Sequence, residues 1–274
     1  MTTPPLISVV VVSWNVAESL RRCLESVFAA RYPRLEVFVI DNASTDDSAK
    51  VAKSFSGITF IQNTKNLGFP KAVNIGLRQS RGDYLVVLNP DTRLPKSFFQ
   101  KSWEFFQTHP DAWIMGPRLT DPDGTPQGSV FPESSILATV REFWLGQQGL
   151  TAKYTPQSSK LVPVFAVSGS CMVFPRSTLD KIGLFTEEVF MYYEDIDYCR
   201  RIHRSGGQVY FNSEIAVVHE HGHSARQSAR ANPGILPFWQ GHLWTSSLWY
   251  NGPLKHYLMW FISHSGQKLR SLFH

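Results

Sequence analysis

Three carboxylates stand within four residues of one another, directly after a run of aromatic side chains. They are Glu194, Asp195 and Asp197, and the aromatic run occupies residues 190–193. Charged side chains are seldom placed beside apolar ones without a partner or a task, and the tasks open to carboxylates are proton transfer and cation binding. Apolar positions at spacings of three and four predict a helix over 196–205. In the plain structural interpretation, the carboxylates only stabilise the N-terminus of that helix.

A second set of polar residues follows three short runs of β-branched and aliphatic residues. Asn15, Asp41 and Asp91 each come soon after such a run, and these runs are typical of strands covered on both faces of a parallel sheet. The carboxyl ends of parallel strands lie at one edge, where open α/β sheets bind their ligands. Each polar residue can also be explained as turn chemistry or a helix cap. Their coincidence at one edge favours a ligand site.

Alternating strands and helices must position these residues. Strand, helix and strand over about 35 residues form a right-handed βαβ unit. In the first half, the predicted strands are 6–13, 35–40, 58–61 and 84–88, and the predicted helices are 20–28, 48–54 and 71–79. In the second half, the pattern predicts strands at 113–117, 164–167, 171–174, 208–211 and 215–218, a turn at 121–124, and no regular period over 133–162. We therefore expect an α/β fold with a Rossmann-like, mostly parallel central sheet flanked by helices.

Composition and missing motifs argue against several classes of protein. No window of 18 uninterrupted apolar residues predicts a membrane-spanning helix. The three cysteines have neither CxxC nor Cys/His spacing, which indicates no disulfide framework or zinc site and fits a reducing, cytoplasmic setting. Neither GxGxxG nor GxxxxGK[ST] is present. A net charge of +5 is compatible with phosphate-bearing ligands, nucleic acid or an anionic membrane, and it selects none of them.

A nucleotide-binding fold without a glycine-rich phosphate loop must neutralise phosphate by another route. A carboxylate such as Asp91 cannot bind phosphate directly. It can hold a divalent cation that bridges two phosphate oxygens.

Five motifs, taken in order, resemble those of a known family. They are SVVVVSWN at 8–15, VIDNASTD at 39–46, NLGFPKAVNIG at 66–76, LNPD at 88–91 and YEDID at 193–197. As a set they closely resemble the inverting, A-type nucleotide-sugar glycosyltransferases of family 2, and especially their rhamnosyltransferase-like branch. The resemblance covers roughly residues 6–224 and implies the A-type glycosyltransferase fold.

The resemblance implies a donor site in the first half of the chain. Asp41 matches the carboxylate that reads the pyrimidine base, and Asn15 and Ser44 match residues lining the same pocket. Asp91 resembles the last carboxylate of the family's Asp-x-Asp motif, which holds a divalent cation, Mg²⁺ or Mn²⁺. Asn89 stands where that motif often has aspartate, which leaves one fewer negative charge. The remaining residues implied for the donor are Asn66, Gly68 and Asn74.

The resemblance also implies catalytic and acceptor residues in the second half. Asp195 matches the family's catalytic base, and Glu194 beside it would contact the acceptor. His219 matches a histidine that joins Asp91 at the metal or pyrophosphate site. Gly169 and Ser170 match a stretch beside the bound sugar, and a β-bulge is the plain alternative for them.

The implied function is inverting transfer of a sugar from a dTDP- or UDP-sugar to a hydroxyl group of a glycan or lipid-linked acceptor, in cell-surface polysaccharide synthesis. No nucleic acid partner is implied. One alternative is a sugar-phosphate nucleotidyltransferase, but residues 13–18 lack the cations that a triphosphate loop needs. The other is a noncatalytic glycan- or nucleotide-binding scaffold, although Asp41, Asp91 and Asp195 all persist.

We predict a catalytic domain over 1–224, with a donor half of about 1–117 and an acceptor half of about 118–224 that includes the irregular segment 133–162. A helical extension over 225–274 follows. Its aromatic and basic residues are typical of a membrane interface, and polar residues interrupt it too often for a span. We therefore expect peripheral contact with the inner face of a membrane. Packing on the catalytic domain or in a homodimer is the alternative.

Overall fold

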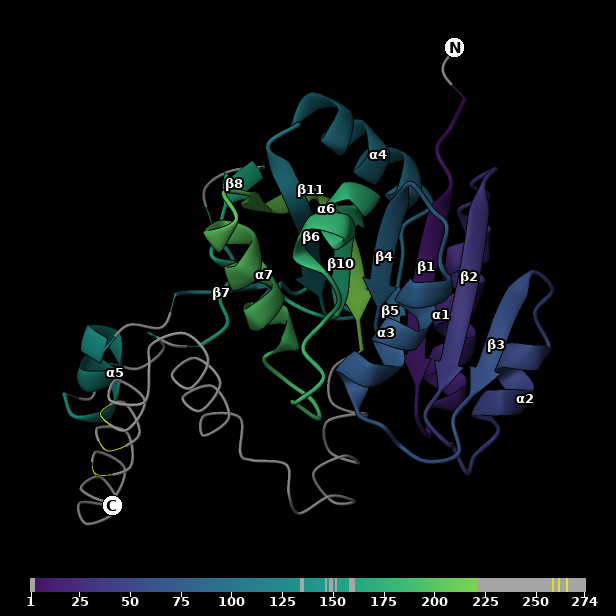
Figure 1. Cartoon of the computed structure of the whole chain (residues 1–274), viewed down its shortest axis with the longest axis horizontal. Helices are drawn as coiled ribbons and strands as arrows, with labels where there is room; N and C mark the ends of the chain where they lie inside the picture. Colours follow the sequence, from purple (N-terminus) through teal and green to yellow (C-terminus); the bar gives the residue numbers. More distant parts are fainter. Residues whose placement is uncertain are drawn as a thin grey trace.

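The structure is a computed structural model that describes residues 3–220 apart from 134–135, 146, 148–149, 151 and 158–160. Beyond residue 220 it describes only Leu258, Phe261 and Ser265, so the predicted extension over 225–274 lies almost entirely outside the described residues. One mixed sheet of nine strands forms the centre of the molecule, with helices on both faces (Figure 1). The predicted α/β fold with a central sheet flanked by helices is confirmed.

The sheet has the strand order β3-β2-β1-β4-β10-β6-β11-β5, and β8 pairs with β11. Its first four strands are parallel. All seven residues of β1 are buried, because this strand lies between two others and is covered on both faces. The bounds are β1 Ile7–Ser13, β2 Leu35–Asp41, β3 Ile58–Gln62, β4 Tyr84–Leu88, β5 Thr92–Arg93, β6 Ala112–Thr120, β8 Leu161–Pro163, β10 Cys171–Pro175 and β11 Gln208–His219, with β7 Val130–Phe131 and β9 Ala166–Val167 forming a separate pair.

Helices cover the sheet in two layers with separate apolar cores. One core joins the sheet to α1, α2 and α4, and the other joins it to α3, α6 and α7 (Figure 1). The helices are α1 Ala17–Ala29, α2 Ser48–Lys53, α3 Phe69–Gln79, α4 Phe98–Thr108, α5 Ile136–Phe143, α6 Arg176–Ile182 and α7 Glu194–Arg204. The sequence prediction lacks α4, although its buried residues Phe98, Ser102, Phe105 and Phe106 have the spacing of one helix face.

The second half of the chain enters the sheet out of sequence order. Strand β10 lies between β4 and β6 and is antiparallel to both. The predicted division near residue 117 falls inside β6, so both halves share one sheet. The prediction of two strands over 208–211 and 215–218 is wrong, because β11 is continuous through an irregularity between Asn212 and Ala216. The strand predicted over 164–167 is also corrected to β9, which contains only Ala166–Val167.

Candidate active site

The ends of β4 and β10 bring the two sets of polar residues together. Leu88 at the end of β4 pairs with Cys171 at the start of β10. One residue further on, the amide of Asn89 donates a hydrogen bond to the carbonyl oxygen of Ser170 at 2.9 Å. The loop that carries Asp91 therefore lies directly beside the turn that carries Gly169 and Ser170.

The residues predicted to read the base form one hydrogen-bonded group after β1 and β2. Asp41 is fully buried, and its carboxylate accepts hydrogen bonds from the amide and hydroxyl of Ser44 and from Gln62 Nε2 at 3.2 Å. The hydroxyl of Ser44 in turn accepts a hydrogen bond from the amide of Asn15 at 2.9 Å. Asn15 Oδ1 accepts a hydrogen bond from the amide of Thr45 at 2.7 Å. These contacts hold the two loops together at the carboxyl edge of the sheet.

Asn66, Gly68 and Asn74 hold the chain segment that leads into α7. Asn66 Oδ1 accepts a hydrogen bond from the amide of Gly68 at 3.0 Å. The amide of Phe69 donates a hydrogen bond to the carbonyl oxygen of Phe190 at 2.8 Å. Asn74 is fully buried, and its side chain pairs with both the amide and the carbonyl group of Phe185. In this structure the Asn74 amide is therefore engaged by protein groups, and it positions the segment that precedes the acidic residues.

Gly68 allows the close approach of this segment. Its φ is +86°, and a Cβ at this position would lie 2.4 Å from the carbonyl oxygen of Phe190. Gly124 is a matched control, because its φ is +89° and no atom lies within 4 Å of the corresponding Cβ position. Both Gly→Ala changes incur about 1 kcal/mol from the positive φ. We expect Gly68→Ala to lower the free energy of unfolding by about 1–3 kcal/mol more than Gly124→Ala. Urea unfolding checks this, and equal losses would contradict it.

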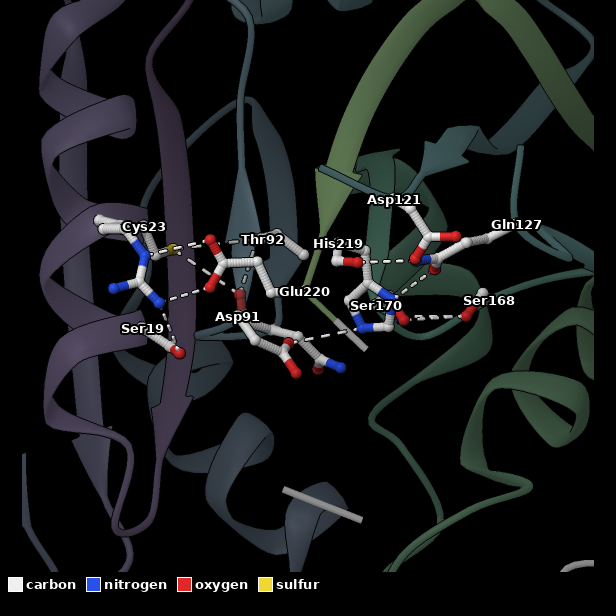
Figure 2. Close-up of polar contacts among 12 residues, drawn as sticks. Ser19, Cys23, Asp91, Thr92, Asp121, Gln127, Ser168, Ser170, His219 and Glu220 are labelled. Carbon is white, nitrogen blue, oxygen red and sulfur yellow. Dashed lines mark hydrogen bonds and ion pairs between the residues drawn. The ribbon is translucent and has the colours of Figure 1, made fainter. Parts of the chain in front are cut away.

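Asp91 directly precedes β5 and His219 ends β11, its antiparallel neighbour, and Figure 2 shows the two side chains turned toward each other. Both side chains are buried, and Asp91 Oδ1 lies 3.4 Å from His219 Nε2. Within the described part of the chain, this carboxylate oxygen accepts no hydrogen bond. Glu220 contributes to the site by donating its amide to the carbonyl oxygen of Asp91 at 2.7 Å, while its carboxylate pairs with Arg22.

Gln127, which the sequence analysis missed, determines which nitrogen of His219 faces Asp91. Gln127 Nε2 donates to Asp121 Oδ1 at 2.5 Å and to the carbonyl oxygen of His219 at 2.7 Å (Figure 2). Because both partners are acceptors, the other Gln127 atom must be Oε1, and it lies 2.9 Å from His219 Nδ1. Nδ1 therefore carries the proton, and in a neutral imidazole the lone pair of Nε2 is directed at the Asp91 side.

Glu194 and Asp195 form a buried acidic pair in the first turn of α7. Asp195 Oδ2 accepts a hydrogen bond from the amide of Gly169 at 2.8 Å, and Oδ1 accepts one from Ile196 at 2.8 Å. Burial and the neighbouring Asp195 raise the pKa of Glu194 to about 8. Burial also raises the pKa of Asp195, but nearby Lys153 and the two amides oppose this rise. The two amides favour the ionised form of Asp195, whereas Glu194 Oε2 accepts no hydrogen bond from the described residues.

The turn before α7 is strained. Tyr192 and Tyr193 both have a φ of +73°, a left-handed conformation that is rare for bulky residues and costs about 1–3 kcal/mol each. Such strain is found at sites where geometry has a functional purpose. It directs Glu194 and Asp195 toward the turn at 168–170.

The predicted residues thus lie in three groups along one edge of the sheet. The third group combines residues that sequence analysis assigned to donor, metal, acceptor and catalysis: Asn89, Asp91, Gly169, Ser170, Glu194, Asp195 and His219. Within the described residues, no group of three or more His, Cys, Asp or Glu side chains has the arrangement of a metal site. A cation at Asp91 and His219 would need ligands beyond these two side chains.

The sequence of this chain is similar to those of several known proteins. The family model described as Glycosyl transferase family 2 matches residues 8–183. N-acetylglucosaminyl-diphospho-decaprenol L-rhamnosyltransferase of Mycobacterium tuberculosis is 28% identical over 80% of this chain and 77% of that protein. Low-salt glycan biosynthesis hexosyltransferase Agl10 of Haloferax volcanii is 27% identical over 78% of this chain and 66% of that protein.

Solved structures of similar fold include a mannosyltransferase and the protein TarS. Mannosyltransferase PcManGT from Pyrobaculum calidifontis, in complex with GDP-Man and Mn²⁺, has a TM-score of 0.60 and 17% identity, covering 97% of this chain and 76% of that one. Residues 1–349 of TarS from S. aureus have a TM-score of 0.57 and 18% identity, over 78% of this chain. This chain spans only 60% of that TarS structure. At these identities the likeness shows the fold, and the expected A-type glycosyltransferase fold is confirmed.

Proposed function

Because this chain belongs to glycosyl transferase family 2 and is a glycosyltransferase, we propose that it transfers a sugar from a dTDP- or UDP-sugar to a hydroxyl group of a glycan or lipid-linked acceptor in cell-surface polysaccharide synthesis. The names of its rhamnosyltransferase and hexosyltransferase relatives support this reading. They favour a rhamnosyltransferase-like enzyme. The scaffold and nucleotidyltransferase alternatives have no comparable support.

One observation carries the proposal. The hydrogen bond between Asn89 and Ser170 joins the Asp91 loop to the turn that holds Asp195 through Gly169. A group suited to the leaving diphosphate therefore lies beside a group suited to take a proton from the acceptor. Transfer with inversion requires both in one place, since the hydroxyl attacks as the diphosphate departs.

We assign the donor nucleotide to the loops after β1 and β2. Asp41, held by Ser44, supplies an oriented carboxylate that can accept a hydrogen bond from the N–H of a pyrimidine base. Asn15, which is half-buried, shares this pocket through Ser44. Asn66 and Gly68 lie between this pocket and the segment before α7 and would border the donor phosphates and sugar.

A divalent cation, Mg²⁺ or Mn²⁺, fits the residues at Asp91 and His219. A buried carboxylate oxygen of Asp91 that accepts no hydrogen bond from the described residues lies 3.4 Å from Nε2 of His219. Both atom types are cation ligands, and two protein ligands leave positions for phosphate oxygens. When bound, the cation would stabilise charge on the leaving diphosphate. The backbone amide of Asn89 donates a hydrogen bond to the carbonyl oxygen of Ser170. The side chain of Asn89 is neutral and would be a weaker ligand than the aspartate of the family motif.

Asp195 is the proposed general base. An ionised Asp195 takes the proton of the acceptor hydroxyl. At the same time the hydroxyl oxygen attacks the anomeric carbon, and the bond from that carbon to the diphosphate breaks. Inversion needs only this one displacement, so no nucleophile from the enzyme is required. Glu194, protonated at neutral pH by its raised pKa, can donate a hydrogen bond to the acceptor.

A lipid-linked acceptor would place the enzyme at the inner face of a membrane. Of the helices that the structure describes, none has the length and apolar character to cross a bilayer. The aromatic and basic residues proposed to lie on the membrane surface, which include Trp244, Trp249 and Trp260, fall outside the described residues. A homodimer interface is the competing use of this segment.

One experiment tests both parts of this function. The protein is incubated with a panel of dTDP- and UDP-sugars and with polyprenyl-diphosphate-sugar acceptors in anionic liposomes, and the products are identified by mass spectrometry after flotation. We expect a product heavier by one sugar residue of inverted configuration, and protein in the floating fraction. A variant with serine at Trp244, Trp249 and Trp260 should float less but retain transfer to a detergent-solubilised acceptor. Absence of product with every donor would contradict the proposed function, and equal flotation of both proteins would contradict the membrane contact.

A further inference from the structure

A lysine on the acceptor side of the chain binds the turn that holds the acidic pair. Lys153 is half-buried, and its ammonium lies 4.8 Å from the centre of the Phe131 ring. Nζ donates a hydrogen bond to the hydroxyl of Ser168 at 2.9 Å. The residue after Ser168 is Gly169, whose amide binds Asp195. A positive charge therefore supports the same turn that holds the proposed base.

The backbone around Lys153 forms a defined support. Tyr154 and Val130 exchange two hydrogen bonds, of 3.0 and 3.1 Å, which makes residue 154 an isolated antiparallel bridge to β7. Gly128 lies against Lys153, because an added Cβ at Gly128 would be 2.6 Å from Lys153 Cβ. The lysine is thus held by a paired backbone and by a neighbour without a side chain, and its position does not depend on its own flexible stem alone.

Resting on the proposed role of Asp195, we propose that Lys153 is a positioning residue whose charge keeps Asp195 the ionised member of the Glu194–Asp195 pair. Two adjacent buried carboxylates resist a second negative charge. A single ammonium group nearby stabilises one negative charge on the pair, and the other carboxyl group can remain protonated. Asp195 benefits most, because it already accepts two backbone hydrogen bonds whereas Glu194 Oε2 accepts none from the described residues.

The charged and titratable groups that act on this pair come from three segments. They are Glu194, Asp195, Asp197 and Cys199 of α7, Tyr192 two residues before this helix, and Lys153 of the segment at 152–157. Among these groups Lys153 is the cation, and it lowers the pKa of both carboxylates. Burial in turn lowers the pKa of Lys153, and the two carboxylates counteract that change.

Lys153→Met tests the proposal by removing the charge while keeping most of the apolar stem. The rate of sugar transfer is measured between pH 5 and 9. We expect the acid limb of the profile to move upward by about one pH unit, because the pKa of Asp195 rises when the nearby cation is lost. On the acid limb, below the pKa of Asp195 in both proteins, the rate should fall about tenfold, and the rate on the alkaline plateau should fall much less.

Two matched variants separate charge from structure. Lys153→Arg keeps the charge and should keep the acid limb near its original position. Lys181→Met removes another lysine that lies over an aromatic ring, that of Trp113 at 4.4 Å, and should leave the profile unchanged. An acid limb that stays in place in Lys153→Met, with an equal loss of rate at every pH, would mean that Lys153 only supports the 168–170 turn, and the proposal would be wrong.

A second measurement does not depend on finding the substrates. A carboxyl group with a raised pKa in the folded protein binds its proton more tightly when folded, so stability is lost as pH rises from the unfolded pKa through the folded one. Removal of Lys153 extends that loss to higher pH. We expect Tm to fall more steeply between pH 5 and 8 in Lys153→Met than in wild type, Lys153→Arg or Lys181→Met. Parallel Tm curves would overturn the proposal, and this result is independent of whether transfer is observed.

Discussion

Replacement of Asp195 by asparagine is expected to reduce turnover by about 10²- to 10⁴-fold and to leave donor binding intact. Loss of a positioned general base has this magnitude. Asparagine keeps the shape of the side chain and can still receive the Gly169 amide at its carbonyl oxygen, but it cannot take a proton at neutral pH. Steady-state transfer rates and the dissociation constant of the donor, measured by calorimetry, test the two parts separately.

Two neighbouring carboxylates serve as controls for Asp195. Asp197 binds Thr186 at 2.6 Å and Arg201 at 3.0 Å, so Asp197→Asn should reduce stability more than it reduces the rate of transfer. Glu194→Gln should raise KM for the acceptor with a smaller effect on kcat. If Glu194→Gln is inactive and Asp195→Asn is active, the base is Glu194 and our assignment is wrong by one residue.

Asp91→Ala is expected to reduce turnover by at least about 100-fold and to weaken donor binding. It removes the carboxylate that would hold the divalent cation opposite His219, and removal of groups around a bound metal typically costs 10- to 100-fold or more. Excess chelator should reproduce the loss in wild type and have no further effect on the variant. Binding of Mn²⁺ with nucleotide, followed by electron paramagnetic resonance, provides a reading that does not require turnover.

Asp123→Ala is the control for this change. Asp123 lies in an exposed turn, where its carboxylate accepts a hydrogen bond from the amide of Thr125. It should leave both Mn²⁺ binding and turnover unchanged. Full activity of wild type in excess chelator would contradict the metal role of Asp91. Cationic side chains such as Arg22 and Arg93, which lie near Glu220, would then be the remaining way to neutralise the diphosphate.

The first half of the fold could be predicted from sequence because its strands are continuous buried runs. Strand β1 is covered on both faces and is accordingly apolar or β-branched at nearly every position. The second half resisted prediction because its strands are short or irregular. Strand β9 has two residues, and β11 passes through a bulge that places polar Asn212 and Ser213 inside one strand. Neither pattern has a clear period.

The site could be predicted as far as its parts are local. The acidic pair and the residues after each strand are contiguous in sequence, so their motifs were recognisable. Gln127 contacts His219 across 92 residues, and Arg22 contacts Glu220 across 198. Such partners depend on tertiary packing and leave no sign in the local sequence. Lys153 belongs to a segment without periodicity, and nothing around it in the sequence indicates a role near Asp195.

The position of β10 affects how the chain is made. Because β10 fills the space between β4 and β6, β4 lacks its second neighbour and β6 lacks its first until residues 171–175 have left the ribosome, and β6 gains β11 only later. Synthesis of the intervening residues takes on the order of ten seconds, and unpaired edges of buried strands are templates for aggregation during that time. The nascent chain that has passed Thr120 but has not reached Pro175 therefore exposes unpaired edges of both β4 and β6 at once, which is the kind of intermediate that chaperones protect.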